Sequence, residues 1–205
     1  AMDALAVAWR LPDLARRLFV EGALSASYLP ELAKTLEADR RQAQRLAGGS
    51  LLLLAMTVSG VVLLGEIAIW LTSLLVDSDG VGLLLRLQAV TLPFVLTSCL
   101  AAHLAVTLNS IKHFAIPALA PAMLNVVWLV AVVFISPRVS DDPGTQAMVL
   151  AGSLLIGGIV QVAAQWLALV KERFLPQIHW PKRRQQIARI ARSAVPAIRR
   201  WNCAT

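Results

Sequence analysis

The chain has 205 residues, of which 58% are hydrophobic and only 15% are charged, and its formal net charge is +7. A soluble domain is about half apolar and about a quarter charged, so a mean hydropathy of +0.68 argues against an ordinary soluble domain. Several uncharged stretches approach the roughly 20 residues that cross a bilayer. The sequence therefore predicts an all-α fold, a polytopic transmembrane helical bundle.

The basic balance does not indicate a nucleic-acid-binding protein. Lysines and arginines collect between and after the apolar stretches, which is typical of the positive-inside pattern of membrane proteins. We expect no enzyme activity, because the sequence contains no nucleophile elbow, phosphate-binding glycine loop or paired carboxylates. We also expect no cofactor or metal, since the histidines and the two cysteines, Cys99 and Cys203, lack ligand spacing.

Residues 1–36 are predicted to form a broken transmembrane helix that carries arginines. Arg10, Arg16 and Arg17 interrupt its apolar stretch, and Pro12 and Pro30 lie inside it. Charge is costly in lipid, so this helix should face a water-filled cavity or other protein.

Residues 37–170 are predicted to contain four further spans, over residues 46–76, 87–108, 114–135 and 147–170. Arg86 is assigned to the loop before the second of these. Glu66 is expected at the membrane interface, although an intramembrane carboxylate could also carry an ion. Cys99 and His103 are expected to pack inside the bundle. Interhelical hydrogen bonds are expected for three amides: Asn125, Gln161 and Gln165.

The orientation follows from the distribution of lysine and arginine. The counts alternate along the chain and place loops 37–45 and 109–113 and the tail 171–205 in the cytoplasm. Five spans in this orientation require an earlier span, and a new apolar stretch begins at 193–198, so we expect a fragment truncated before its next helix. The basic, amphipathic tail is predicted to lie on the membrane surface, with a partner-binding helix as the alternative.

Three passages resemble the MurJ/MviN family of lipid II flippases. Residues 10–25 (RLPDLARRLFVEGALS) are similar to the family pattern R/K-L-P-N-L-L-R-R-x-F-A-E-G-A-F-S, and residues 108–125 (LNSIKHFAIPALAPAMLN) to L-N-S-x-x-R-F-A-I-P-A-x-x-P-x-L-L-N. Residues 84–87 (LLRL), followed by Pro93 and Phe94, resemble L-L-R/K-I-x-x-P-Y. Asp13 replaces the family's asparagine, and the pair Lys112 and His113 departs from its arginine.

The resemblance implies part of the N-terminal lobe of a multidrug/oligosaccharidyl-lipid/polysaccharide exporter fold, in the bacterial inner membrane. It implies movement of lipid II, an undecaprenyl-pyrophosphate-linked peptidoglycan precursor, to the outer leaflet by alternating access, with membrane lipids as neighbours and a coupling ion or the membrane potential as a possible driving force. The substrate-binding residues it implies are Arg16, Arg17, Asp3 and Arg10. The structural residues of its motifs are Glu21, Gly22, Asn109, Pro117, Pro121 and Asn125.

Arginine chemistry supports this reading independently. A pyrophosphate needs fixed positive charge within the membrane, and the planar guanidinium donates two parallel hydrogen bonds to it. The alternative is that these arginines extend to an interface. We favour the cavity for Arg16 and the interface for Arg10, and Arg17 fits both.

Two other functions stay open. One is a related exporter of lipid-linked oligosaccharides or drugs, although a cavity for cationic drugs would favour acidic residues. The other is a membrane scaffold without transport, in which removal of residues 182–200 should matter more than a change of Arg16. We expect the isolated chain to be inactive in transport.

Overall fold

The computed structural model describes residues 25–75 and 79–177, and every regular element in these ranges is a helix. This confirms the predicted all-α fold class for the described part of the chain. In chain order the elements are α2 (Ser25–Ala38), α3 (Arg40–Leu75), α4 (Asp79–Thr91), α5 (Pro93–Ser110), α6 (Ala115–Val130), the π-helical η2 (Ala131–Ile135), α7 (Ser136–Val139) and α8 (Pro143–Lys171).

Four stretches are long and apolar enough to cross a membrane, and they match the four spans predicted within residues 37–170. They cover Arg40–Leu75, Val81–Ser110, Ala115–Val139 and Pro143–Lys171. The first has 36 residues, about 54 Å at 1.5 Å per residue, against a hydrocarbon core of about 30 Å. It must therefore tilt or extend beyond the core. Of the predicted broken helix 1–36, only the part from residue 25 is described.

The second of these spans begins earlier than predicted, so the assignment of Arg86 to a loop is wrong. Arg86 lies inside α4 and is exposed. Its long side chain can reach an interface while its stem covers apolar surface, so one arginine does not end the helix. Pro93 instead marks the boundary between α4 and α5, and Leu92 between them keeps helical dihedrals, φ −62° and ψ −41°.

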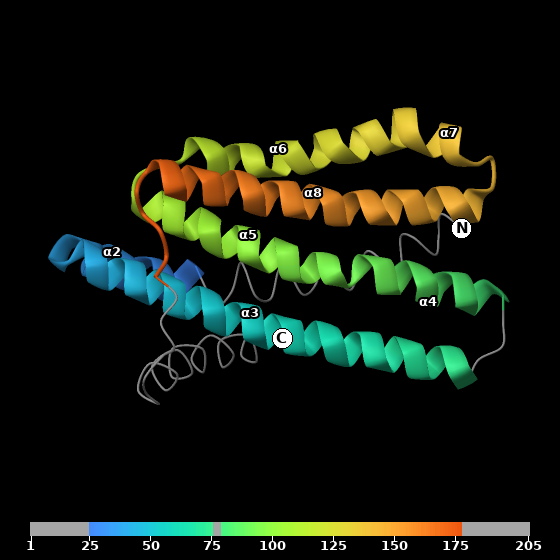
Figure 1. Cartoon of the computed structure of the whole chain (residues 1–205), viewed down its shortest axis with the longest axis horizontal. Helices are drawn as coiled ribbons and strands as arrows, with labels where there is room; N and C mark the ends of the chain where they lie inside the picture. Colours follow the sequence, from blue (N-terminus) through green and yellow to red (C-terminus); the bar gives the residue numbers. More distant parts are fainter. Residues whose placement is uncertain (1–24, 76–78, 178–205) are drawn as a thin grey trace, which may run out of the picture.

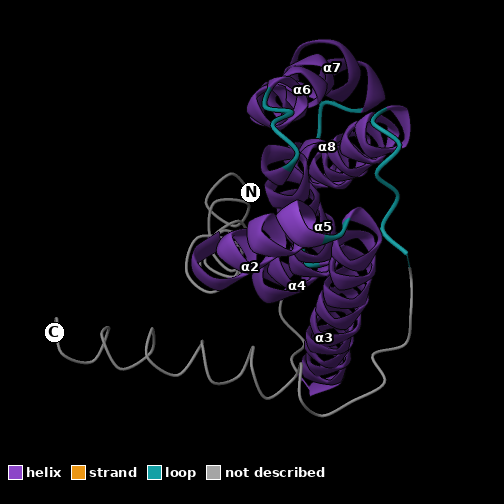
Figure 2. Cartoon of the chain, turned by 90° about the vertical axis from the view of Figure 1, so that its left-hand side faces the viewer, coloured by secondary structure: helices purple, strands orange, loops and turns teal. Residues whose placement is uncertain are grey.

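The long helices are packed side by side (Figure 1). α8 lies between α6 and α5, and α3 packs against α5 and α4 on the other side, with α2 next to α3 and α5 (Figure 2). The α2–α3 turn, the α5–α6 loop and the end of α8 share one end of the bundle, at the left of Figure 1. The described parts of the segments predicted to share one side of the membrane thus lie at one end of the bundle.

Two adjacent glycines let α8 fit closely between its neighbours. A Cβ on Gly158 would lie 2.2 Å from Thr97 Oγ1, and a Cβ on Gly157 would lie 2.7 Å from Leu124 Cδ1. Small residues allow such close approach of membrane helices, for which hydrophobic burial gives little driving force. The glycine pair therefore sets the separation of α8 from α5 on one side and from α6 on the other.

Asp142 caps the start of α8, outside the apolar span. Its carboxylate accepts hydrogen bonds from the Thr145 N–H at 2.7 Å and the Thr145 hydroxyl at 2.9 Å. The backbone bond, followed by the hydroxyl bond, lowers the pKa of Asp142. Pro143 occupies the first helical position, where no N–H is needed.

We predict that Asp142→Ala lowers the melting temperature at neutral pH. A lowered folded-state pKa means that the cap stabilises fully above the ordinary aspartate pKa of about 4 and that its contribution is lost as the pH falls through the folded value. The difference between wild type and Asp142→Ala should therefore shrink in thermal melts taken from about pH 7 down to about pH 3. Asp142→Asn keeps an uncharged acceptor and serves as the control; a difference independent of pH would contradict the assignment.

Candidate functional site

The predicted substrate-binding residues lie outside the described residues. These are Asp3, Arg10, Arg16 and Arg17, and the motif residues Glu21 and Gly22 lie there as well. The described chain resumes at Ser25, the last residue of the first family-like motif, where α2 begins. Because α2 follows directly from the arginine-bearing segment, its contacts are the nearest described support for that segment.

A buried polar junction holds α2 against α3 and α5. Its members are Tyr28 on α2, Ser50 on α3, and His103 and Thr107 on α5. The Tyr28 hydroxyl lies 3.1 Å from Thr107 Oγ1, and Ser50 Oγ lies 3.0 Å from His103 Nε2. The Tyr28 and His103 rings meet edge to face at 4.5 Å between centroids. This confirms the prediction that His103 packs inside the bundle.

Leucines surround this polar junction. Tyr28 belongs to an apolar cluster with Leu32, Leu104 and Leu108, and the last three are almost completely inaccessible to solvent. Polar groups in such surroundings are stable only when they are bonded. The Tyr28–Thr107 bond therefore specifies how α2 sits on α5, within a cluster stabilised by apolar burial.

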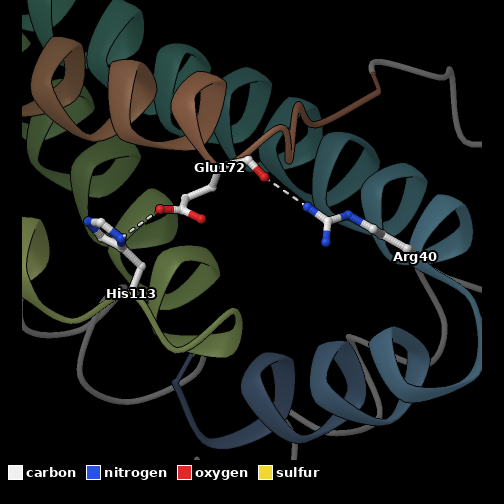
Figure 3. A network of polar contacts seen from close by, with 3 residues as sticks. All are labelled: Arg40, His113 and Glu172. Carbon is white, nitrogen blue, oxygen red and sulfur yellow. Dashed lines mark hydrogen bonds and ion pairs between the residues drawn. The ribbon is translucent and has the colours of Figure 1, made fainter.

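A charged network joins three helix ends at the same end of the bundle (Figure 3). Arg40 Nη2, at the start of α3, donates to the Glu172 carbonyl oxygen at 2.8 Å. Glu172 Oε1 lies 3.1 Å from His113 Nδ1, on the α5–α6 loop. Arg40 also satisfies a carbonyl at the negative end of the α8 dipole. The His113–Glu172 contact is partly exposed, so it should contribute only about 0–1 kcal/mol.

The first residues of the predicted tail, 171–205, pack against the bundle. Phe174 is fully buried among core residues of α2, α3, α5 and α8, and the Arg40 guanidinium lies 5.7 Å from its ring centre. The Gln177 N–H donates to the Gln44 carbonyl at 3.0 Å. The docked segment, residues 172–177, therefore fastens the exit of α8 to α3; residues 178–205 are outside the described part.

Gly48 makes room for this docked segment. A Cβ at position 48 would lie 2.1 Å from the Gln177 carbonyl oxygen, a backbone atom. We predict that Gly48→Ala lowers the free energy of unfolding by about 1–3 kcal/mol, as overpacking does. Gly60→Ala on the same helix is the matched control, since nothing lies within 4 Å of its Cβ. Equal stability of the two variants in equilibrium unfolding would refute the contact.

The predicted structural residues of the second motif have separate positions. Asn109 is half-buried near the end of α5 and its carbonyl accepts the Lys112 N–H at 3.1 Å. Pro117 lies in the first turn of α6, and Pro121 lies one turn further inside the helix. The Gln161 amide on α8 donates to the Ala120 carbonyl beside Pro121, which confirms the interhelical bond predicted for Gln161.

The interhelical bond predicted for Asn125 is not found among the described helices and stays a prediction. Asn125 is exposed, and no hydrogen bond joins its side chain to another part of the described chain. The reason is its place on the helix, because Leu124, the preceding residue, contacts α8 at Gly157 and successive residues differ by about 100°. Gln165 is fully buried, but its Oε1 has no donor in the described chain, so the interhelical bond predicted for it is not found there.

Three important residues were not singled out by the sequence. Tyr28 is the only tyrosine of the chain, and a buried tyrosine hydroxyl needs a partner, but nothing in its neighbourhood identified Thr107. Phe174 follows the last span by three residues, in a basic stretch that masked its role.

In residues 25–75 and 79–177, no group of three His, Cys, Asp or Glu residues could hold a metal ion.

Comparison with known proteins gives one family. A family model described as Lipid II flippase MurJ matches residues 1–201. A probable lipid II flippase MurJ of Rhizobium tropici is 30% identical over 203 residues, 95% of this chain and 38% of that protein. A probable lipid II flippase MurJ of Bdellovibrio bacteriovorus is 32% identical over 205 residues, which are 96% of this chain and 38% of that protein.

A third relative, the lipid II flippase MurJ of Burkholderia cenocepacia, is 30% identical over 184 residues, 86% of this chain and 35% of that protein. The chain thus spans a little over a third of the length of these relatives. The match includes residues 10–25 and 108–125, the two longest family-like passages.

Proposed function

Because the chain belongs to the lipid II flippase MurJ family, we propose that it forms part of a transporter that moves lipid II from the inner to the outer leaflet of the bacterial inner membrane. The observation that carries this proposal is the family match over residues 1–201, together with four apolar spans packed as one bundle. Transport would proceed by alternating access, with an ion gradient or the membrane potential as the source of energy.

Arg16 and Arg17 would bind the pyrophosphate of lipid II. This role rests on the match of residues 10–25 to the family motif and on the ability of arginine to bind phosphate with paired hydrogen bonds. Asp3 and Arg10 would lie nearer the mouth of the same path. The bundle of α3, α5 and α8 would form the wall that supports α2 and, through it, this segment.

The distribution of charge supports a cytoplasmic position for the end of the bundle that holds the docked segment. The exposed basic residues at that end are Lys34, Arg40, Arg41, Arg45, Lys112, Lys171 and Arg173, whereas the other end carries Arg138 next to Asp141 and Asp142. Such an asymmetry is the one that orients membrane proteins.

Growth of a bacterium depleted of its own lipid II flippase tests the proposal. The depleted strain is supplied with the full open reading frame that contains these residues, and membrane insertion is verified by fractionation. Lipid II transport predicts restored growth and cell shape. Normal insertion without restored growth would favour a related exporter or a scaffold instead.

A further inference from the structure

The polar junction contains buried hydrogen-bonding groups that the proposed transport chemistry does not use. His103 is 1% exposed, and it lies on a predicted span of a transporter whose driving ion has not been assigned. A histidine at such a place has two readings. It can carry a proton, or it can be a fixed hydrogen-bond donor within the fold.

The hydroxyl protons of the polar junction can be assigned one by one. The Ser50 hydroxyl lies 2.8 Å from the Leu46 carbonyl, to which it donates. We assign the Ser50 proton to this carbonyl, so that the Ser50 oxygen accepts from His103 and the proton of the neutral imidazole is on Nε2. In the same way we assign the Thr107 hydroxyl as the donor to the His103 carbonyl at 2.9 Å and the Tyr28 hydroxyl as the donor to Thr107.

This assignment leaves His103 Nδ1 as a bare acceptor. Nδ1 is buried and has no hydrogen-bond partner. A protonated ring would carry a second N–H at this atom with nothing to accept it. The groups that face the ring are Tyr28 from α2 and Ser50 from α3, both neutral, and no ion pair joins His103 to a carboxylate within the described chain. A charge without a partner would be costly in these surroundings.

We propose that His103 acts as a neutral hydrogen-bond donor that carries no proton, and that its bond to Ser50 fixes the ring on which Tyr28 packs and so, together with the Tyr28–Thr107 bond, positions α2 for transport. This inference rests on the proposed function, because its main readout is transport. Its physical basis is the continuity of α2 with the arginine-bearing segment. The Tyr28–Thr107 bond joins α2 to α5. The Ser50–His103 bond joins α3 to α5 and holds the imidazole against which the Tyr28 ring packs edge to face, and such directional contacts specify a register more sharply than leucine packing alone.

Two amide substitutions separate the two readings of His103. His103→Gln places an amide N–H at about the position of Nε2, where it can still donate to Ser50. His103→Asn is shorter by one carbon, so its amide reaches only the level of Nδ1. Neither amide can carry a proton. Thr57→Val, at an exposed hydroxyl on α3 that bonds only within its own helix, is the control.

The variants are made in the full open reading frame, and lipid II on the outer leaflet is measured in the flippase-depleted bacterium at matched protein levels. We expect His103→Gln and Thr57→Val to retain transport and His103→Asn to lose about tenfold, as expected for one unmade buried bond. Loss in both amide variants would mean that a hydrogen-bond donor at this position does not suffice, and would overturn the proposal. Retention in both, or loss in His103→Gln alone, would overturn the positioning role.

Hydrogen–deuterium exchange of α2, residues 25–38, is read in the same purified proteins. It should increase in His103→Asn and stay unchanged in His103→Gln. If the wild type does not transport lipid II, the proposed function fails. Hydrogen–deuterium exchange of α2 alone then tests whether the polar junction positions this helix. Unchanged exchange of α2 in His103→Asn would refute the positioning role of His103, whatever the transport result.

Discussion

Arg16→Ala should abolish the rescue of a flippase-depleted bacterium by the full open reading frame. In the proposed function the Arg16 guanidinium binds the pyrophosphate of lipid II. Water would not fully replace this guanidinium after the substitution. Removing one partner of such a desolvated charge pair typically costs about 2–5 kcal/mol, equivalent to at least about a thirtyfold loss. Growth of the depleted strain and the amount of lipid II on its outer leaflet are the measurements.

Two further variants show whether the paired geometry of arginine is needed. Arg16→Lys keeps the charge without the planar fork, so it should restore part of the activity. Arg45→Ala removes an exposed arginine at the basic end of the bundle and should leave transport near wild type. Full transport by Arg16→Ala, at normal protein levels, would refute the assigned role.

Phe174→Ala should produce the largest loss of stability in the described part of the chain. Phe174 is the largest fully buried side chain there and packs in the cluster formed by α2, α3, α5 and α8. Replacing a buried phenylalanine with alanine costs about 3–5 kcal/mol, from lost burial and from the cavity that remains. Equilibrium unfolding in bicelles measures this, and exchange of residues 172–177 should increase as the docked segment detaches.

Phe114→Ala is the matched control, because Phe114 is 60% exposed at the start of α6. It should change the free energy of unfolding by about 0.5 kcal/mol or less. Equal losses in the two variants would mean that residues 172–177 do not dock as described.

The spans could be predicted because their length and composition are local properties. An apolar stretch of about 20 residues needs a helix in lipid wherever it lies, and all four predicted spans within residues 37–170 are found. Their ends were less predictable. Arg86 was placed in a loop because hydropathy counts a charge without knowing whether its side chain reaches an interface.

The tertiary contacts could not be predicted, because a single sequence does not identify partners. The polar junction joins Tyr28 to Thr107 across 79 positions of the chain. The docked segment joins Gln177 to Gln44 in the same way. An amide in a span gives no sign of the side it faces, so the sequence could not show that Asn125 is exposed in the described chain. The roles of Arg16, Arg17, Asp3 and Arg10 stay predictions, carried by the family-like motif.

The amount of lipid II on the outer leaflet tests the central claim most directly. It is measured in cells depleted of their own flippase, with and without the full open reading frame, using a probe that cannot cross the membrane. The lipid II flippase account predicts that exposure returns to the level of undepleted cells. An inserted, folded protein that leaves lipid II confined to the inner leaflet would contradict it.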